Sequence, residues 1–233
     1  MHELRRRRRR GERGAVALEA ALIFPVLMLL VFGMIDMSLM LRDYVTVTSS
    51  TRAATRFVSA EAGVGPCTST DTSVCPSGTT VPQVAQDAAD RVQGNLVTVP
   101  ASSVNYLLVY EANQNGYPCA SAGGCNAAIA KQNSVSADSF NGPMPSTCTG
   151  YDSCVKFKWN ATAKAFRYDS GSWNSTTINA CVTKEDNVGV YVNLSHNWLT
   201  GLPPFTGSMT LADRSVTRFE PLTNDICAAG THP

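Results

Sequence analysis

The feature that most constrains this chain is an uncharged apolar segment near its N-terminus. Ala20 to Ile35 reads AALIFPVLMLLVFGMI, without one charged side chain. Extended back to Ala15, it would form about 31 Å of α-helix, which matches the roughly 30 Å hydrocarbon core of a bilayer. A secretory signal peptide has a similar layout, but residues 36–42 contain no convincing small-x-small cleavage site. We therefore expect residues 15–36 to be a transmembrane helix that the mature protein keeps.

Charge is distributed unevenly along the chain. Residues 1–14 hold seven arginines and two glutamates, a net charge of +5; of the 19 basic and 18 acidic residues this leaves 12 and 16, a net charge of −4. The run Arg5 to Arg10 could neutralise nucleic-acid phosphates. Arginines directly before an apolar segment are more typical of the cytoplasmic side of a membrane helix. We expect residues 1–14 to be a basic cytoplasmic leader, and no nucleic acid to be bound.

The helix is predicted to continue outside the membrane over residues 37–62. No proline or glycine occurs between Asp36 and Ala60, and Gly63 would end the segment. The β-branched run Val45 to Thr48 lowers helix propensity but does not forbid continuation. One face of this extension carries a periodic series of side chains: Leu41, Tyr44, Val45, Thr48, Arg52 and Thr55.

Two residues inside the apolar segment bear on helix packing. Pro25 lacks a backbone N–H and is expected to bend the helix near Ala21, which membrane helices tolerate better than soluble ones. Gly33 would let a neighbouring helix approach closely, or it simply fills its position; the second interpretation is the more economical.

The cysteines indicate an oxidising compartment for the rest of the chain. All eight lie beyond residue 66, an even number confined to the part outside the predicted membrane helix. Spacing favours three short loops and one long link: Cys67–Cys75, Cys119–Cys125, Cys148–Cys154 and Cys181–Cys227. Metal binding is the alternative, but no Cys-x-x-Cys occurs and the chain has three histidines, so zinc-ligand spacing is missing and no metal site is expected.

Residues 63–233 are predicted to form one disulfide-linked α+β domain with a small antiparallel sheet. Residues 81–96 have the apolar spacing of an amphipathic helix, and residues 103–111 read as a buried strand. Val155 to Trp159 alternates apolar and basic residues, which favours an edge strand with its lysines pointing outward. Residues 165–168 could pair with it.

This outer domain offers little for catalysis. No serine or cysteine nucleophile is convincingly placed around His196, and Asp169, Asp186 and Asp213 sit in contexts typical of turns, where carboxylates are solvated or cap backbone groups. No phosphate-binding glycine-rich loop occurs. We expect no catalytic residues, no cofactor and no enzymatic activity.

Gly14, Ala15 and Glu19 form the most informative local pattern. A carboxylate in a membrane helix costs up to about 3 kcal/mol at the bilayer centre and less near an end. If a peptidase cut after Gly14, Ala15 would gain a free ammonium group, and Glu19 would lie one helical turn away on the same face. Near the helix N-terminus the carboxylate also interacts favourably with the helix dipole. The same carboxylate could instead reach the amine of an adjacent subunit.

The stretch RGAVALEAA, residues 13–21, resembles the N-terminus of TadE-like pseudopilins of the Flp/Tad (tight adherence) pilus system. Pro25 and the later sequence STRAATR, residues 50–56, fit the same resemblance. More loosely, residues 188–194 and 209–221, ending in Arg-x-Glu-Pro, resemble the closing hairpin of TadE-like outer domains. Ala20 follows the glutamate where major Flp pilins tend to carry tyrosine, which favours a minor subunit.

The resemblance implies a structural protein of the cell membrane, with its N-terminus cytoplasmic and residues 63–233 extracytoplasmic. It implies cleavage between Gly14 and Ala15 by a prepilin peptidase, and assembly with other pilin or pseudopilin subunits and Tad assembly proteins. The alternative is a single-pass anchor that carries an extracellular binding module. That alternative predicts an intact N-terminus.

Overall fold

The computed structural model describes residues 2–76, 81–119, 142–203 and 205–228, with side chains from residue 16 onward. Its elements follow the order α1, α2, β1, β2, β3, β4 and β5, with short 3-10 turns at Ala101–Ser103 and Ser175–Thr177. The chain forms two compact units. The first joins Met1–Arg42 to Asn197–Met209, and the second joins Asp43–His196 to Thr210–Pro233. We call the second unit the outer domain.

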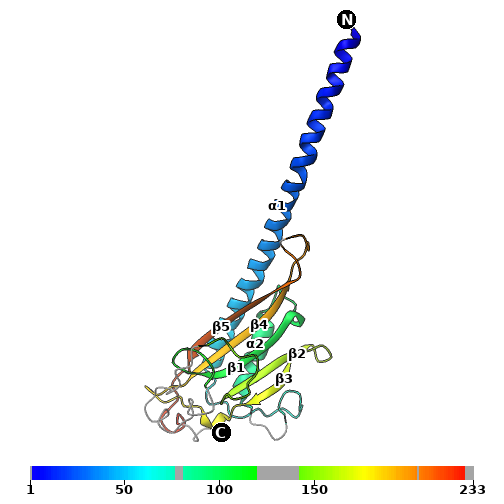
Figure 1. Cartoon of the computed structure of the whole chain (residues 1–233). Coiled ribbons are helices and arrows are strands. Elements are labelled where there is room, and N and C mark those ends of the chain that lie inside the picture. Colours follow the sequence, from blue (N-terminus) through cyan, green and yellow to red (C-terminus); the bar gives the residue numbers. More distant parts are fainter. Residues whose placement is uncertain (1, 77–80, 120–141, 204, 229–233) are drawn as a thin grey trace. The chain divides into compact units, whose positions relative to one another are not determined.

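Helix α1 runs from His2 to Ser59 without a break (Figure 1). It passes through the β-branched run Val45 to Thr48, as expected, and Pro25 lies inside it. The bend expected near Ala21 stays a prediction. It is longer than the predicted helix because the arginine-rich leader is also helical. It ends three residues early, in a turn formed by Ala60 to Gly63.

The outer domain is built on a five-stranded antiparallel sheet with the strand order β3-β2-β1-β4-β5. The strands are β1 (Val104–Ala112), β2 (Cys154–Asn160), β3 (Ala165–Ser172), β4 (Asn187–Asn197) and β5 (Ser208–Arg218). In the centre, β1 pairs with both β2 and β4, with Leu107 opposite Phe157 on one side and Val192 on the other. The α+β fold class predicted from sequence is therefore confirmed.

The prediction that Val155 to Trp159 forms an edge strand is wrong. Strand β2 lies between β1 and β3, so both of its edges are hydrogen-bonded. Of its two lysines, Lys158 is half-exposed but Lys156 is largely buried. The alternation of apolar and basic residues reflected the two faces of the sheet, because a sequence pattern of period two does not reveal how many neighbours a strand has.

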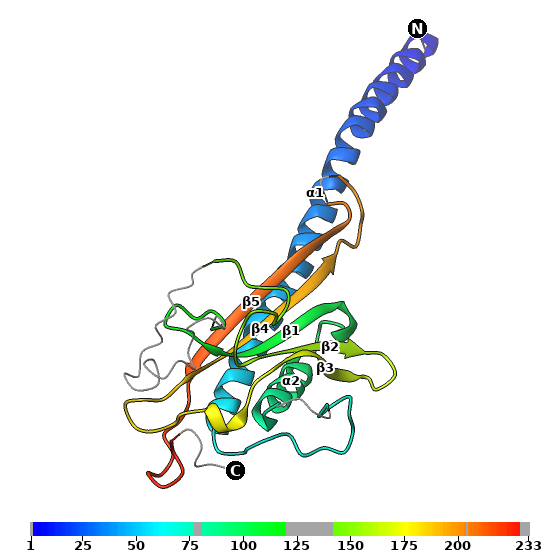
Figure 2. The ribbon, with the colours of Figure 1, turned by 60° about the horizontal axis from the view of Figure 1, so that its bottom comes forward.

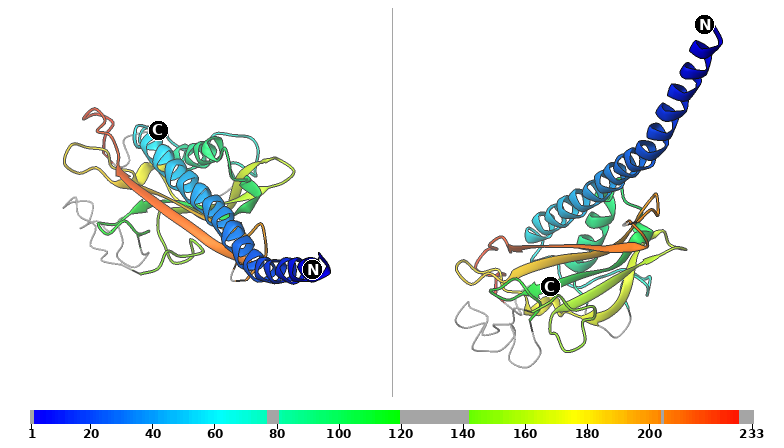
Figure 3. Two further views of the ribbon diagram at one scale, coloured as in Figure 1. Left: turned by 90° about the horizontal axis from the view of Figure 1, so that it is seen from above. Right: turned by 45° about the horizontal axis from the view of Figure 1, so that its top comes forward.

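Helix α2 (Gln83–Asn95) and the C-terminal part of α1 lie on the same side of the sheet (Figure 3). Helix α2 buries Val84, Ala88 and Val92, the stripe predicted from sequence. Leu107 and Val109 alternate with the residues of the opposite face, and both are fully buried. This layer is the main core of the outer domain.

The other face of the sheet carries a second, smaller cluster. Leu108, Tyr110 and Tyr191 are buried there beside the Cys148–Cys154 disulfide. Gly189 of β4 is required for this packing, since a Cβ at that position would lie 2.5 Å from the Tyr110 ring. The loop that contains Cys148 therefore covers a face that would otherwise expose aromatic rings.

Disulfides connect the irregular parts of the outer domain. The structure contains Cys67–Cys75, Cys148–Cys154 and Cys181–Cys227, three of the pairs that the spacing favours. Cys119 is also disulfide-bonded, while its predicted partner Cys125 lies outside the described residues. The Cys181–Cys227 bond spans 46 positions and holds the C-terminal segment against the turn before β4.

Candidate functional site

The predicted processing segment lies inside the first part of α1. Gly14 and Ala15 have helical backbone, and their side chains are outside the described part of the chain. Glu19 is solvent-exposed on the same helix. Four residues separate Ala15 from Glu19, so an amine created at Ala15 would lie on the same helix face as the carboxylate.

The apolar half of α1, Val16 to Ile35, is exposed along its length. Leu22 is 70% exposed and Phe24 is 56% exposed. Among the described residues, one helix is long and apolar enough to cross a membrane, and its most apolar window buries nothing within the chain. An exposed apolar surface of this length requires lipid or other apolar helices around it.

Near the end of the apolar half, α1 holds the loop that joins β4 and β5 (Figure 2). Asp36 is fully buried; its Oδ1 accepts the backbone N–H of Leu199 at 2.9 Å, and its Oδ2 accepts the Thr200 hydroxyl. These bonds compensate the cost of burying a carboxylate. One turn earlier, a Cβ at Gly33 would lie 3.0 Å from the Phe205 ring. Gly33 therefore accommodates a side chain of this protein's own loop.

Beyond Arg42, the buried face of α1 is unexpectedly polar. Asp43 Oδ2 lies 2.8 Å from His196 Nδ1 of β4. Thr51 donates to Asp213 at 3.3 Å, and the Thr55 and Ser215 hydroxyls are 2.9 Å apart. Apolar residues separate these polar contacts, and the fully buried ones are Val47, Ala54 and Val58. Hydrogen bonds thus set the register of α1 against β4 and β5.

The face of α1 that sequence periodicity singled out is mostly exposed instead. Leu41, Tyr44 and Val45 are 54%, 43% and 63% exposed. In the outer domain this face forms a shallow groove of about 560 Å³, lined by Tyr44, Val45, Thr48, Ser49, Arg52, Ala53 and Arg56. Thr55, assigned to the same face, is buried. The predicted side chains do share one face of α1, but most of that face is exposed, and a different face of the helix contacts the sheet.

His196 and the aspartates find structural partners. His196 is buried against Asp43, and the Asp186 carboxylate accepts the Asn179 N–H at 2.7 Å. Asp213 belongs to β5 and Asp169 to β3. The prediction that these two aspartates lie in turns is therefore wrong. Among the described residues, no group of three or more histidines, cysteines or carboxylates is arranged to hold a metal ion.

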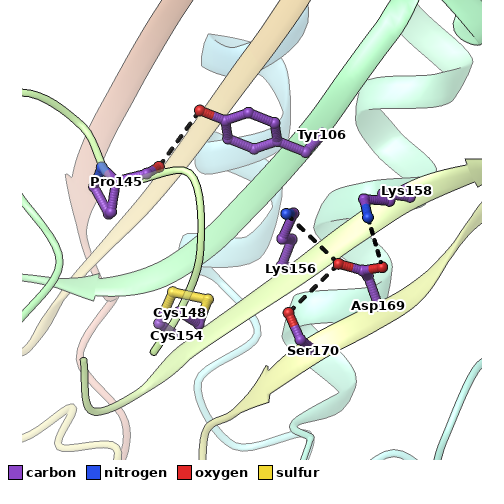
Figure 4. Close-up of polar contacts among 8 residues, drawn as sticks. All are labelled: Tyr106, Pro145, Cys148, Cys154, Lys156, Lys158, Asp169 and Ser170. Atoms are coloured by element: carbon purple, nitrogen blue, oxygen red, sulfur yellow. Dashed lines mark hydrogen bonds and ion pairs between the residues drawn. A yellow bond between two sulfur atoms is a disulfide. The ribbon is translucent and has the colours of Figure 1, made fainter. Parts of the chain in front are cut away.

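Asp169 connects the two lysines of β2 on the face away from the helices (Figure 4). Its carboxylate lies 3.0 Å from Lys158 Nζ and 3.6 Å from Lys156 Nζ. The Lys156 ammonium also lies over the Tyr106 ring, 5.0 Å from its centroid. Burial raises the pKa of the Tyr106 hydroxyl to about 12, so the ring remains neutral at physiological pH. The cluster links β2 to β3 and to Tyr106 of β1 on this face of the sheet.

The carboxyl group of Glu61, in the outer domain, has a strongly altered acidity. Burial, followed by the neighbouring Asp87 carboxylate on α2, raises the pKa of Glu61 to about 7. Arg91 acts in the opposite direction, and its guanidinium packs 3.7 Å from the centroid of the Phe57 ring. Glu61 lies in the turn after α1, so this group couples the end of α1 to α2.

These features define a class: an α+β protein with an N-terminal apolar helix that is suited to anchor it in a membrane. Residues 14–56 match the family model described as TadE-like protein. The match begins at Gly14 and ends in the last turn of α1, so it covers α1 from Gly14 onward and stops before the sheet. The resemblance noted for RGAVALEAA and STRAATR is thereby confirmed.

The match indicates a component associated with a Tad pilus, a system in which TadE-like proteins are structural rather than enzymatic. The apolar half of α1 is consistent with a single-pass membrane anchor in such a system. Neither the curated proteins nor the solved structures include a significant match to the chain.

Proposed function

We propose that the protein is a minor pseudopilin of a Tad-type pilus or secretion apparatus, matured by a prepilin peptidase between Gly14 and Ala15. The observation that carries this proposal is the TadE-like match, which starts at Gly14 and includes Glu19 and the whole apolar half of α1. A structural role also agrees with the outer domain, whose buried histidine and carboxylates are engaged in holding α1 and the loops.

Cleavage would change the charge balance at the membrane. The leader that is removed carries a net charge of +5. The new ammonium at Ala15 would lie one turn from Glu19 and would offset the cost of a carboxylate near the inner leaflet. The same carboxylate is exposed in the isolated chain. It is therefore also available to the amine of a neighbouring subunit, which would fix the axial register of an assembly.

The charge distribution and the cysteines support one orientation across the membrane. The arginine-rich leader favours the cytoplasm. The disulfides all belong to the opposite end of the chain and require an oxidising compartment. The outer domain is accordingly displayed on the extracytoplasmic side.

The exposed stripe of α1 supplies a surface for other pilin or pseudopilin helices. Its groove combines small or apolar side chains such as Val45 and Ala53 with the arginines Arg52 and Arg56. An apolar floor permits close helix packing, and the arginines can pair with carboxylates of a neighbour. The apolar half of α1 provides the same opportunity within the membrane.

The deciding experiment is mass spectrometry of the mature N-terminus, with the full chain expressed beside the prepilin peptidase of its own Tad system. We expect a product that begins at Ala15, and the uncut chain when the peptidase is absent. Gly14→Val should block cleavage. Gly11→Val, the same change in the same leader, should not. A mature protein that still begins at Met1, or one cut beyond Ile35, would reject the proposal; an intact N-terminus would favour an anchored binding module.

Glu19→Ala separates processing from assembly. We expect cleavage to remain largely possible, because the scissile bond is unchanged, while pilus assembly falls strongly because the new amine loses its partner. Glu19→Gln, which keeps the size of the side chain, should behave like Glu19→Ala if charge is the cause. Piliation measured beside cleavage in the same cells checks this; normal piliation in both variants contradicts it.

A further inference from the structure

The loop between β4 and β5 has an unusual composition for an exposed segment. From Asn197 to Ala212 the sequence contains no charged residue, and the loop reads NWLTGLPPFTGS. Leu199 is 71% exposed and Leu202 is 40% exposed. The rings of Trp198 and Phe205 pack together with centroids 5.1 Å apart. Exposed leucines beside paired aromatic rings form an apolar patch, which normally marks a binding surface.

The place at which this loop is attached to α1 indicates what covers the patch. Phe205 lies against Gly33, which is inside the uncharged segment of α1. Gly33 precedes Ile35, the last residue of that segment, by about 3 Å of helix rise. Asp36, the first charged residue after the segment, binds Leu199 and Thr200 of the same loop. The loop therefore begins at the polar boundary of the segment and extends to its apolar side.

We propose that the apolar side chains of this loop, Trp198, Leu199, Leu202 and Phe205, insert into the lipid headgroup region on the outer side of the membrane. Tryptophan and phenylalanine rings flanked by leucines are the side chains that favour the boundary between headgroups and acyl chains. The loop backbone requires nearby water, which the headgroup region supplies and the acyl core does not. The patch is continuous with the apolar surface of α1, so a bilayer that surrounds α1 also reaches the loop.

This arrangement gives Asp36 and Gly33 specific roles. A carboxylate at the edge of the hydrocarbon core is costly unless it is hydrogen-bonded. The Leu199 N–H and the Thr200 hydroxyl supply those bonds and fix the loop at this depth. Gly33 leaves space for the Phe205 ring. The proposal depends on α1 spanning the bilayer with this loop on its outer side, which is common to the pseudopilin and to a simple anchored module.

Tryptophan fluorescence of the full-length protein in vesicles tests the proposal. The protein is reconstituted into phosphatidylcholine vesicles, with or without lipids brominated near the headgroup end of their acyl chains. Flotation of the vesicles verifies insertion. The chain has three tryptophans, and we expect bromolipid quenching in the wild type and in Trp159→Phe. Trp198→Phe, the matched substitution in the loop, should lose that quenching. Equal quenching of the two variants, or none in the inserted wild type, overturns the proposal.

A second pair of variants keeps Trp198 as the probe. Leu199→Asp adds a charge to the loop and should reduce quenching and shift Trp198 emission to longer wavelength. Val97→Asp makes the same kind of change at a residue of the outer domain that is 84% exposed, and should leave both readouts unchanged. Unchanged quenching in Leu199→Asp overturns the proposal, as does wild-type quenching that appears only after the protein is diluted in the membrane, which would assign the loop to another subunit. An intact Met1 together with Trp198 quenching would reject the pseudopilin but not lipid insertion.

Discussion

The two halves of α1 differ in which side chains they expose and which they bury. From Val16 to Ile35, apolar side chains are exposed all round, and Glu19, near the start, is the one charged residue. From Asp43 to Ser59, the buried face contains Asp43, Ser50 and Thr51, while the exposed face contains Tyr44 and Val45. The stability of the first half depends on the lipid or apolar helices that surround it. The second is governed by specific hydrogen bonds to β4 and β5. One helix therefore combines an apolar segment suited to a membrane with a second segment whose hydrogen bonds fix its register against β4 and β5.

The difference between the two halves explains why hydropathy alone describes only the first. An apolar residue in the first half gains from lipid and needs no partner. In the second half, small and polar residues allow close approach to the sheet, provided that each buried polar group is bonded. The apolar residues left on the outside of this half are then available to another subunit.

The largest expected effect comes from a charge placed in the apolar half of α1, which should reduce membrane insertion. Leu27→Lys places a charge in the exposed apolar segment and should cost about 3 kcal/mol of membrane insertion, on the order of a hundredfold in the inserted fraction. Val45→Lys, the same kind of change at an exposed apolar residue of the second half, should leave insertion almost unchanged. Resistance to alkaline carbonate extraction measures both. Equal extraction of the two variants would contradict the division of α1.

Substitutions at Asp43 and Tyr44, neighbours on opposite faces of α1, test whether the polar face of the second half stabilises the outer domain. Asp43→Ala removes a hydrogen-bonding partner of the buried His196 and should destabilise the outer domain by about 1–3 kcal/mol. Tyr44→Ala lies on the exposed face and should change the free energy of unfolding by less than about 0.5 kcal/mol. Chemical denaturation of the full-length protein in detergent distinguishes them. If the exposed face is an assembly surface, Tyr44→Ala should instead reduce piliation.

The smallest expected effect concerns the end of α1. Because the pKa of Glu61 is raised from 4.5 to about 7, the folded protein binds this proton more tightly than the unfolded chain does. The stability due to this group is therefore present below about pH 4.5 and is lost as pH rises through 7. Glu61→Gln should flatten the decline of melting temperature between pH 5 and roughly pH 7.5. Glu220→Gln, at an exposed glutamate, should retain the wild-type slope; loss of the slope in both would show that Glu61 is not its source.

Local sequence rules predicted much of the fold. The membrane segment, the stripe of α2 and the central strand β1 follow from composition and periodicity, which depend on neighbours along the chain. Two of the three described disulfides join cysteines that are close in the sequence. The third, Cys181–Cys227, joins the two cysteines left over after the close pairs are assigned. The position of β2 did not follow. Lys156 looked like an edge residue, yet it is covered by Asp169 and Tyr106 from the two neighbouring strands.

The sequence alone determined that one helix is too apolar for water, that its N-terminal residues resemble those of TadE-like proteins, and that the remainder forms a disulfide-linked α+β domain. Only the tertiary structure decided which face of α1 is buried, and that Gly33 and Asp36 receive a loop from far along the chain. The physical reason is that a polar residue such as Asp43 or Asp36 can be buried only when its bonding partners arrive. Here those partners, His196 and Thr200, lie 153 and 164 positions away along the chain.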